Sequence, residues 1–134
     1  MKVTVYQIPH ERIRPQFMRT KEFQNTERRL MCGGSKKWNA NTDFDYYMPV
    51  AEVSINPDME MMEGWTQPEL EDYAEITFQK MQRVDESRNP DNDPDVKDLT
   101  GANLYHSMMV SDIVEIDGTY FMVDNSGFTK ILIT

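Results

Sequence analysis

His106, Ser111 and Asp112 are the residues of this 134-residue chain whose types and spacing come nearest to a reactive set. Serine, histidine and aspartate are the residue types of a nucleophilic triad. Ser111 and Asp112, however, are neighbours in an apparent strand, where adjacent side chains point to opposite faces. With Asp124, these residues are therefore predicted to shape turns or to form a polar binding site at one end of a hairpin. The sequence predicts no catalytic residue.

Cysteine and histidine spacing gives no support to metal or thiol chemistry. Cys32 is the single cysteine, and His10 and His106 are the two histidines. The chain has no HxxxH, HxH or CxxC pattern, and it lacks the glycine-rich motifs GxGxxG and GxxxxGK[ST]. A Cys32–His106 pair would meet only in the fold and is a minor alternative. We predict no metal site and no cofactor.

Alternating carboxylates at Asp91, Asp93 and Asp95 resemble the start of a calcium loop. An EF-hand loop would need glycine at its sixth position and glutamate at its twelfth, where this chain has Val96 and Ala102. The stretch is therefore predicted to be a solvated acidic loop that binds calcium no more tightly than millimolar.

Composition and charge exclude several classes. No apolar run approaches the roughly 20 residues of a membrane span, and the N-terminus lacks the apolar stretch of a secretory signal. We expect one cytoplasmic domain over residues 1–134, with no membrane partner.

The net charge of −9 is unevenly distributed along the chain. Residues 1–40 hold nine Lys or Arg against three Glu, and residues 41–134 hold five Lys or Arg against twenty Asp or Glu. Either the two parts pack on each other, or one of them meets a charged partner.

Periodicity predicts the elements that position these residues. Residues 3–8 alternate apolar and polar side chains, which indicates a strand, and residues 44–55 form a second strand with an interruption at Pro49. A Gly33-Gly34-Ser35 run predicts a flexible connector. Asp117-Gly118 predicts a type I′ hairpin within 113–123, and a further strand follows at 128–133.

The clearest helix signal covers residues 67–84. Thr66 and Glu69 have the spacing of a capping box, and Pro68 suits the first turn. Apolar residues follow at three- and four-residue intervals: Leu70, Tyr73, Ala74, Thr77, Phe78 and Met81. The predicted fold class is α+β, a small, mostly antiparallel sheet with one main amphipathic helix packed on it. The 113–133 meander is expected to pair with the 3–8 strand.

The C-terminal third resembles a known family. Gly101, the run His106–Val114 (HSMMVSDIV) and the run Tyr120–Phe128 (YFMVDNSGF) are similar to the YodL-like domain of Gram-positive bacteria, their phages and conjugative elements. The family pattern is G-H-S-x-S-V-S-D-V-V, a hairpin, then Y-Y-V-D-S-x-G-F. This chain departs from it at Met109, at Asn125 and by a four-residue insertion at 102–105. The resemblance implies a mobile-element context and no particular activity.

Three hypotheses for function follow. The first is a non-enzymatic, acidic interaction protein of a phage or mobile element, which binds stoichiometrically a protein with a basic surface, for example as an anti-defence inhibitor or a DNA mimic. Its candidate binding residues include a Met-rich, acidic stretch beside a tryptophan: His106, Ser111, Asp112, Asp124, Glu60, Glu63 and Trp65. The second is a nucleic-acid binder that uses the basic 12–37 segment and a stacking tryptophan: Arg12, Arg14, Arg19, Arg28, Arg29, Lys36, Lys37 and Trp38. The third is a small enzyme with a polar site near His106.

Overall fold

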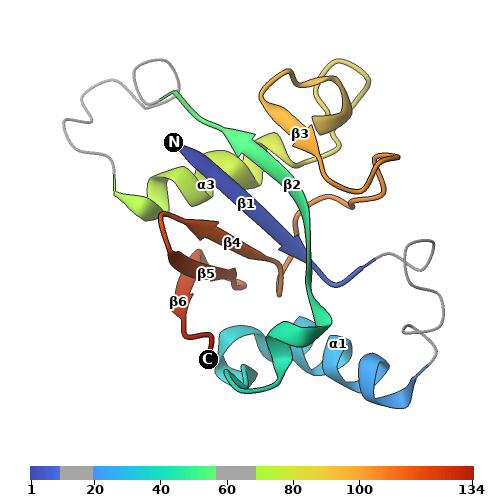
Figure 1. The fold of residues 1–134 in the computed structure, drawn as a ribbon, viewed down its shortest axis with the longest axis vertical. Helices are drawn as coiled ribbons and strands as arrows, with labels where there is room; N and C mark the ends of the chain where they lie inside the picture. The colour runs from blue at the N-terminus through green and yellow to red at the C-terminus, as the bar shows by residue number, and fades with distance from the viewer. Residues whose placement is uncertain (10–19, 57–68) are drawn as a thin grey trace.

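A six-stranded antiparallel sheet forms the centre of the protein (Figure 1). The computed structural model describes residues 1–9, 20–56 and 69–134. The strand order is β3-β2-β1-β4-β5-β6. The strands are β1 (Lys2–Gln7), β2 (Met48–Ser54), β3 (Val96–Asp98), β4 (Ile113–Ile116), β5 (Thr119–Val123) and β6 (Phe128–Ile131). Because β1 pairs with both β2 and β4, the predicted pairing of the C-terminal meander with the first strand is confirmed.

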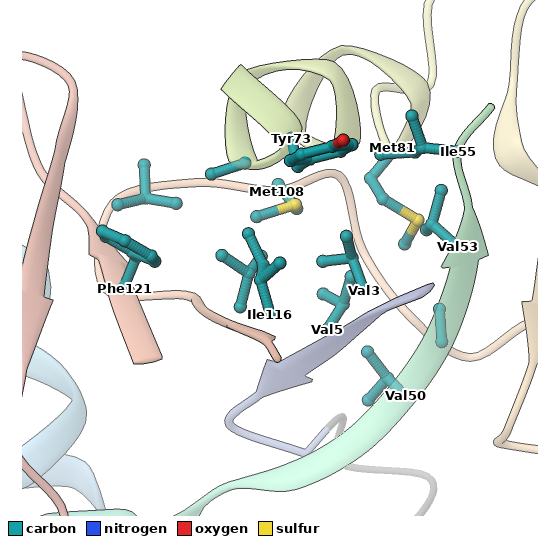
Figure 2. Close-up of a cluster of buried hydrophobic side chains, with 14 of the residues drawn as sticks. Val3, Val5, Val50, Val53, Ile55, Tyr73, Met81, Met108, Ile116 and Phe121 are labelled. Atoms are coloured by element: carbon teal, nitrogen blue, oxygen red, sulfur yellow. The ribbon is translucent and has the colours of Figure 1, made fainter. Parts of the chain in front are cut away.

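Helix α3 (Leu70–Lys80) covers one face of this sheet, as the apolar stripe predicted. Figure 2 shows Val3, Val5 and Ile116 of the sheet pointing towards Tyr73 of the helix and Met81 at its end. Burial of these side chains removes apolar surface from water, which is worth about 25 cal/mol per Å². The α+β class and the small antiparallel sheet are therefore confirmed. Neither helix of the described ranges has the length and apolar character of a membrane span.

A second helix, α1 (Lys21–Gly33), packs on the opposite face and was not predicted. Thr20 caps it, since its hydroxyl accepts a hydrogen bond from the amide of Phe23 (3.2 Å). Phe23 and Leu30 are its large buried side chains, and they pack with Ile113 of β4 and Met122 of β5. The sheet is thus covered by a helix on each face (Figure 1).

Short 3₁₀ helices correct two of the sequence predictions. Residues 44–46 are not strand, because η3 (Asp43–Tyr46) occupies them and β2 begins at Met48. Pro49 lies inside β2 opposite Tyr6, where the β1–β2 register shifts. The predicted connector at 33–35 is instead the end of α1 and the start of η2 (Gly34–Lys37). A third 3₁₀ helix, η4 (Pro90–Asn92), lies in the acidic loop.

The boundaries of α3 also differ from the prediction of a helix over 67–84. Glu69 is the N-cap residue with extended backbone angles, and its amide donates to the Asp72 carboxylate at 2.8 Å. The capping box is therefore Glu69–Asp72, and the predicted Thr66–Glu69 box is wrong; residues 66–68 lie outside the described ranges. The helix ends at Lys80, and the amide of Arg83 already donates to the hydroxyl of Ser107 (2.9 Å).

The predicted type I′ turn at Asp117-Gly118 is confirmed. Asp117 (φ 52°) and Gly118 (φ 81°) both have the positive φ that a type I′ turn requires. Gly127 has φ 80° in the turn between β5 and β6. The next residue, Phe128, packs its ring edge-on against Phe78 of α3, with 6.2 Å between ring centroids.

Candidate functional site

Asp112 is buried where the turn before β4 meets the end of β1. Its Oδ2 accepts hydrogen bonds from Gln7 Nε2 (3.0 Å) and from the amide of Met109 (3.1 Å). Burial raises the pKa of Asp112 well above its ordinary value, and these two donors offset only part of that shift. The residue therefore resists ionisation more than an exposed aspartate does.

Gln7 joins the same carboxyl to the backbone of His106. Its Nε2 donates to the His106 carbonyl (2.9 Å), and its Oε1 accepts from the His106 amide (3.1 Å). Tyr47 adds a hydrogen bond from its hydroxyl to the Ser111 carbonyl (2.5 Å). Burial raises the pKa of Tyr47, and the nearby Asp112 raises it further, so this hydroxyl stays a donor. Gln7 and Tyr47 thus hold the 106–112 turn against the sheet.

The geometry of His106, Ser111 and Asp112 is that of a turn held by backbone contacts. His106 Nδ1 lies 2.8 Å from the Ser107 carbonyl, to which it donates, and 3.8 Å from Asp112 Oδ2. Ser111 is buried with φ 85°, and its carbonyl, rather than its hydroxyl, makes the contact with Tyr47. Asp112 therefore does not orient the imidazole through a hydrogen bond, as the acid of a triad would.

Asp124 belongs to a different hydrogen-bond network. Its carboxylate accepts from the amide and hydroxyl of Ser35 at 2.9 and 2.6 Å, and from the hydroxyl of Thr129. Burial would raise the pKa of Asp124, but the hydrogen bonds from Ser35 and Thr129 outweigh it and lower the pKa. The structure thus brings His106, Ser111 and Asp112 into one turn and directs the Asp124 side chain to η2.

Two of the candidate nucleic-acid-binding residues, Arg29 and Trp38, make contacts that stabilise the fold. Arg29 makes two hydrogen bonds to the buried Asp43 (2.7 and 3.0 Å), and this pairing raises the pKa of the guanidinium. Trp38 is half-buried beside Tyr47 and donates its indole N–H to the Leu132 carbonyl (2.8 Å). Three exposed cations remain at the end of α1 and in η2: Arg28, Lys36 and Lys37. The candidates outside the described residues are Arg12, Arg14, Arg19, Glu60, Glu63 and Trp65.

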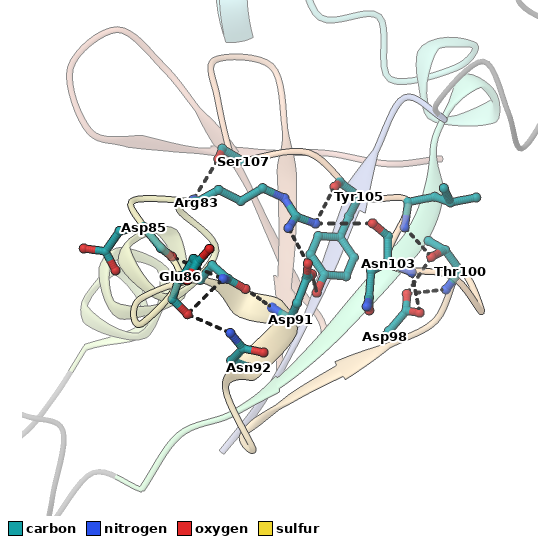
Figure 3. Close-up of polar contacts among 12 residues, drawn as sticks. Arg83, Asp85, Glu86, Asp91, Asn92, Asp98, Thr100, Asn103, Tyr105 and Ser107 are labelled. Atoms are coloured by element: carbon teal, nitrogen blue, oxygen red, sulfur yellow. Dashed lines mark hydrogen bonds and ion pairs between the residues drawn. The ribbon is translucent and has the colours of Figure 1, made fainter.

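Arg83 organises the acidic loop that follows α3, residues 85–95, which includes Asp91, Asp93 and Asp95 (Figure 3). Its guanidinium donates to Asp91 (2.6 Å) and lies over the Tyr105 ring, 4.9 Å from the centroid. Tyr105 completes the triangle, because its hydroxyl donates to the other Asp91 oxygen (2.6 Å). The hydrogen bond from Arg83 is the main cause of the lowered pKa of Asp91. The loop is therefore anchored to the helix end and to the 103–107 segment.

Carboxylates of this loop bind cations of the chain itself. Lys80 of α3 lies 3.3 Å from Asp93 and 3.5 Å from Asp95, while Asp91 is bound to Arg83. Over the described ranges, no group of three or more His, Cys, Asp or Glu side chains is placed to hold a metal ion. The three aspartates of the alternating run thus stabilise the conformation of the loop through ion pairs with Lys80 and Arg83.

The acidic excess of the described residues is concentrated on one side of the sheet. Residues 69–98, which include α3 and the acidic loop, hold ten Asp or Glu and four Lys or Arg. Helix α1 packs on the other face (Figure 1). Residues 20–47, which include α1 and η2, hold five Lys or Arg against four Asp or Glu. Among the described residues, the ion pairs of Lys80 and Arg83 stay within the acidic segment, and Arg29 pairs with Asp43. The acidic segment and α1 therefore do not cover each other there.

Sequence reasoning missed Gln7, Tyr47 and Ser35. A signal for Gln7 is present, because period-two alternation places it on the same face as Val3 and Val5, and a buried amide needs partners. Nothing local indicates that Ser35 meets Asp124, 89 positions later.

Comparisons with known proteins add one partial similarity. No family model matches the chain, and no solved structure matches it. A 67-residue stretch, 49% of the chain, is 39% identical to uncharacterized protein R785 of Acanthamoeba polyphaga mimivirus. That stretch makes up 59% of the viral protein, so the chain spans less than two thirds of its relative's length. The relative's name states no activity, and the YodL-like resemblance stays a prediction.

Proposed function

We propose that this protein is a non-enzymatic interaction protein, which binds a basic protein partner through the acidic side that α3 and the acidic loop form. The observation that carries this is the concentration of acidic residues on the α3 side of the sheet. Ten of the acidic residues belong to the segment 69–98, and helix α1 packs on the opposite face. A surface of one sign attracts a partner of the other sign and speeds its encounter.

The shape of the acidic side supports a defined interface. Glu71 and Glu75 are exposed one turn apart on α3, and Gln79 continues the same helix face. Gln79 also lines a cleft of about 440 Å³, whose other wall includes Asn92 and Pro94 of the acidic loop. The helix face and the loop are thus continuous, and the Arg83 contacts hold the loop in place (Figure 3). A preorganised surface of this kind loses little conformational freedom on binding.

Parallel capture of binding proteins from a host lysate by wild type and two charge-reversal variants tests the proposal. The variant Glu71→Lys/Glu75→Lys reverses two exposed charges of the acidic side, and Glu22→Lys/Asp45→Lys makes the same charge change on exposed residues of the α1 side. Wild type and the Glu22/Asp45 variant should retain the same basic protein at a fixed stoichiometry, and the Glu71/Glu75 variant should lose it. Equal retention by both variants, or loss by both, contradicts binding through the acidic side.

A further inference from the structure

A second cleft lies between η2 and the turn that joins β5 to β6. Its volume is about 380 Å³, within the size range of small-ligand sites. Lys36 and Lys37 line it from η2, while Asp124, Asn125 and Ser126 line it from the turn. None of its lining residues belongs to α3 or to the acidic loop, so it is distinct from the interface proposed above.

Close packing holds the lysine-bearing segment in place. A Cβ at Gly33 would lie 2.2 Å from Cγ of Lys37, so the Lys37 stem lies where another side chain would be. Gly34 has φ 56°, and a Cβ there would lie 2.2 Å from Asp124 Oδ1. The carbonyl of Lys37 also accepts a hydrogen bond from Arg29. These contacts fix η2 at both of its ends and hold the lysines beside the turn.

Four side chains that carry hydrogen-bond donors line the cleft: those of Lys36, Lys37, Asn125 and Ser126. The acceptor on its wall, Asp124, accepts hydrogen bonds from Ser35 and Thr129, and the charge of Lys36 also stabilises this carboxylate. Lys36 and Lys37 are exposed, and neither forms an ion pair with a described residue. The side chains of Asn125 and Ser126 are exposed as well, without a hydrogen bond to the described part of the chain. Two lysines, an asparagine and a serine thus line the same cleft.

We propose that this cleft binds a compact phosphate-bearing anion. Lys36 and Lys37 would donate charge-assisted hydrogen bonds to the phosphate oxygens, and Asn125 and Ser126 would complete their coordination. The net charge of −9 argues for a compact ligand. An anion smaller than the Debye length, about 8–10 Å at physiological salt, experiences mainly the local lysines. A long polyanion extends further and meets the field of the acidic residues.

Titration of the ¹⁵N-labelled full chain with inorganic phosphate, in a phosphate-free buffer at low salt, tests the site. Saturable shifts of the amide signals of residues 34–37 and 125–127 are expected. Lys36→Gln/Lys37→Gln should weaken binding roughly tenfold or more, since it removes both cations. Lys21→Gln/Lys97→Gln makes the same charge change at exposed lysines outside the cleft and should leave binding unchanged. Non-saturable shifts, or equal weakening by both variants, overturn the proposal.

Two further experiments distinguish a loss of binding from a loss of folding, and a compact phosphate ligand from a nucleic-acid strand. Lys36→Arg/Lys37→Arg keeps both charges and should restore binding, whereas failure of this variant at an unchanged melting temperature argues against the site. AMP should shift the same amides and adenosine should not, because the phosphate is the recognised group. A 20-nucleotide single strand that binds these residues more tightly than AMP would overturn the assignment to a compact ligand.

Discussion

Ser35 and Asp124 lie 89 positions apart in the chain and are joined by two hydrogen bonds, since the Ser35 amide and hydroxyl donate to the two oxygens of the carboxylate. This contact attaches η2 to the end of β5. A hydrogen bond to a charged group contributes about 1.5–3 kcal/mol to stability. We therefore expect Asp124→Ala to lower the free energy of unfolding by about 1–3 kcal/mol, measured by urea denaturation.

The pH dependence of this contribution has a definite sign. Because the folded pKa of Asp124 is lowered, its contribution is present above the ordinary aspartate pKa and is lost as pH falls through the folded value. The difference in stability between wild type and Asp124→Ala should shrink in acid. Asp117→Asn, at an exposed position with positive φ that asparagine tolerates, is the control and should change little. A pH-independent difference would contradict the assignment to Asp124.

The contribution of Asp112 to stability should depend on pH in the opposite direction. Its folded pKa is raised, so the penalty for ionising it grows as pH rises from the unfolded value towards the folded one. Asparagine can accept the same hydrogen bonds from Gln7 and Met109 and carries no charge. Asp112→Asn should therefore match wild type at pH 3 and be at least as stable at pH 7, by thermal unfolding at both values. A variant that loses stability at pH 7 and not at pH 3 would show that Asp112 works as a paired anion.

Gln7→Leu should be strongly destabilising. The substitution keeps the buried volume, but it leaves the His106 amide, the His106 carbonyl and the Asp112 carboxyl without a partner on β1. Each unsatisfied buried group costs about 1–3 kcal/mol, so a total loss of about 2–4 kcal/mol is expected. Urea denaturation measures it, and Thr4→Leu, on the other face of the same strand, is the control. Equal effects at the two positions would assign the loss to β1 in general.

Local chemistry explains what could be predicted from the sequence. The Asp117-Gly118 turn and the stripe around Tyr73 and Met81 carry their signals within a few residues, and both formed where expected. Helix α1 was missed because only Phe23, Thr26 and Leu30 of its thirteen residues are buried, and its other faces are polar. The site contacts could not be predicted, because Gln7 and Asp112 are 105 positions apart and meet only when β1 pairs with β4.

Arg83 should control the order of the acidic loop. Lysine keeps the charge, but it cannot donate to Asp91, Asn103 and Tyr105 at once as the guanidinium does. Arg83→Lys should therefore raise amide hydrogen exchange across residues 85–107 several-fold, since local opening becomes easier by about 1 kcal/mol. The β4–β5 hairpin should keep its protection. Arg88→Lys, at an exposed position outside this network, is the control, and equal exchange in the two variants would show that Arg83 does not anchor the loop.

The acidic excess on the α3 side predicts how the association rate with a basic partner depends on salt. If the acidic side attracts a basic surface, the association rate constant with the captured protein should fall steeply as salt is raised from 50 to about 300 mM, because the Debye length shortens. Glu71→Lys/Glu75→Lys should slow association more than it speeds dissociation, since these exposed carboxylates act mainly at a distance. Surface plasmon resonance at several salt concentrations separates the two rate constants. The Glu22→Lys/Asp45→Lys variant has the same net charge, so slower association of the first variant alone assigns the effect to the acidic side. An association rate that salt leaves unchanged would rule out steering.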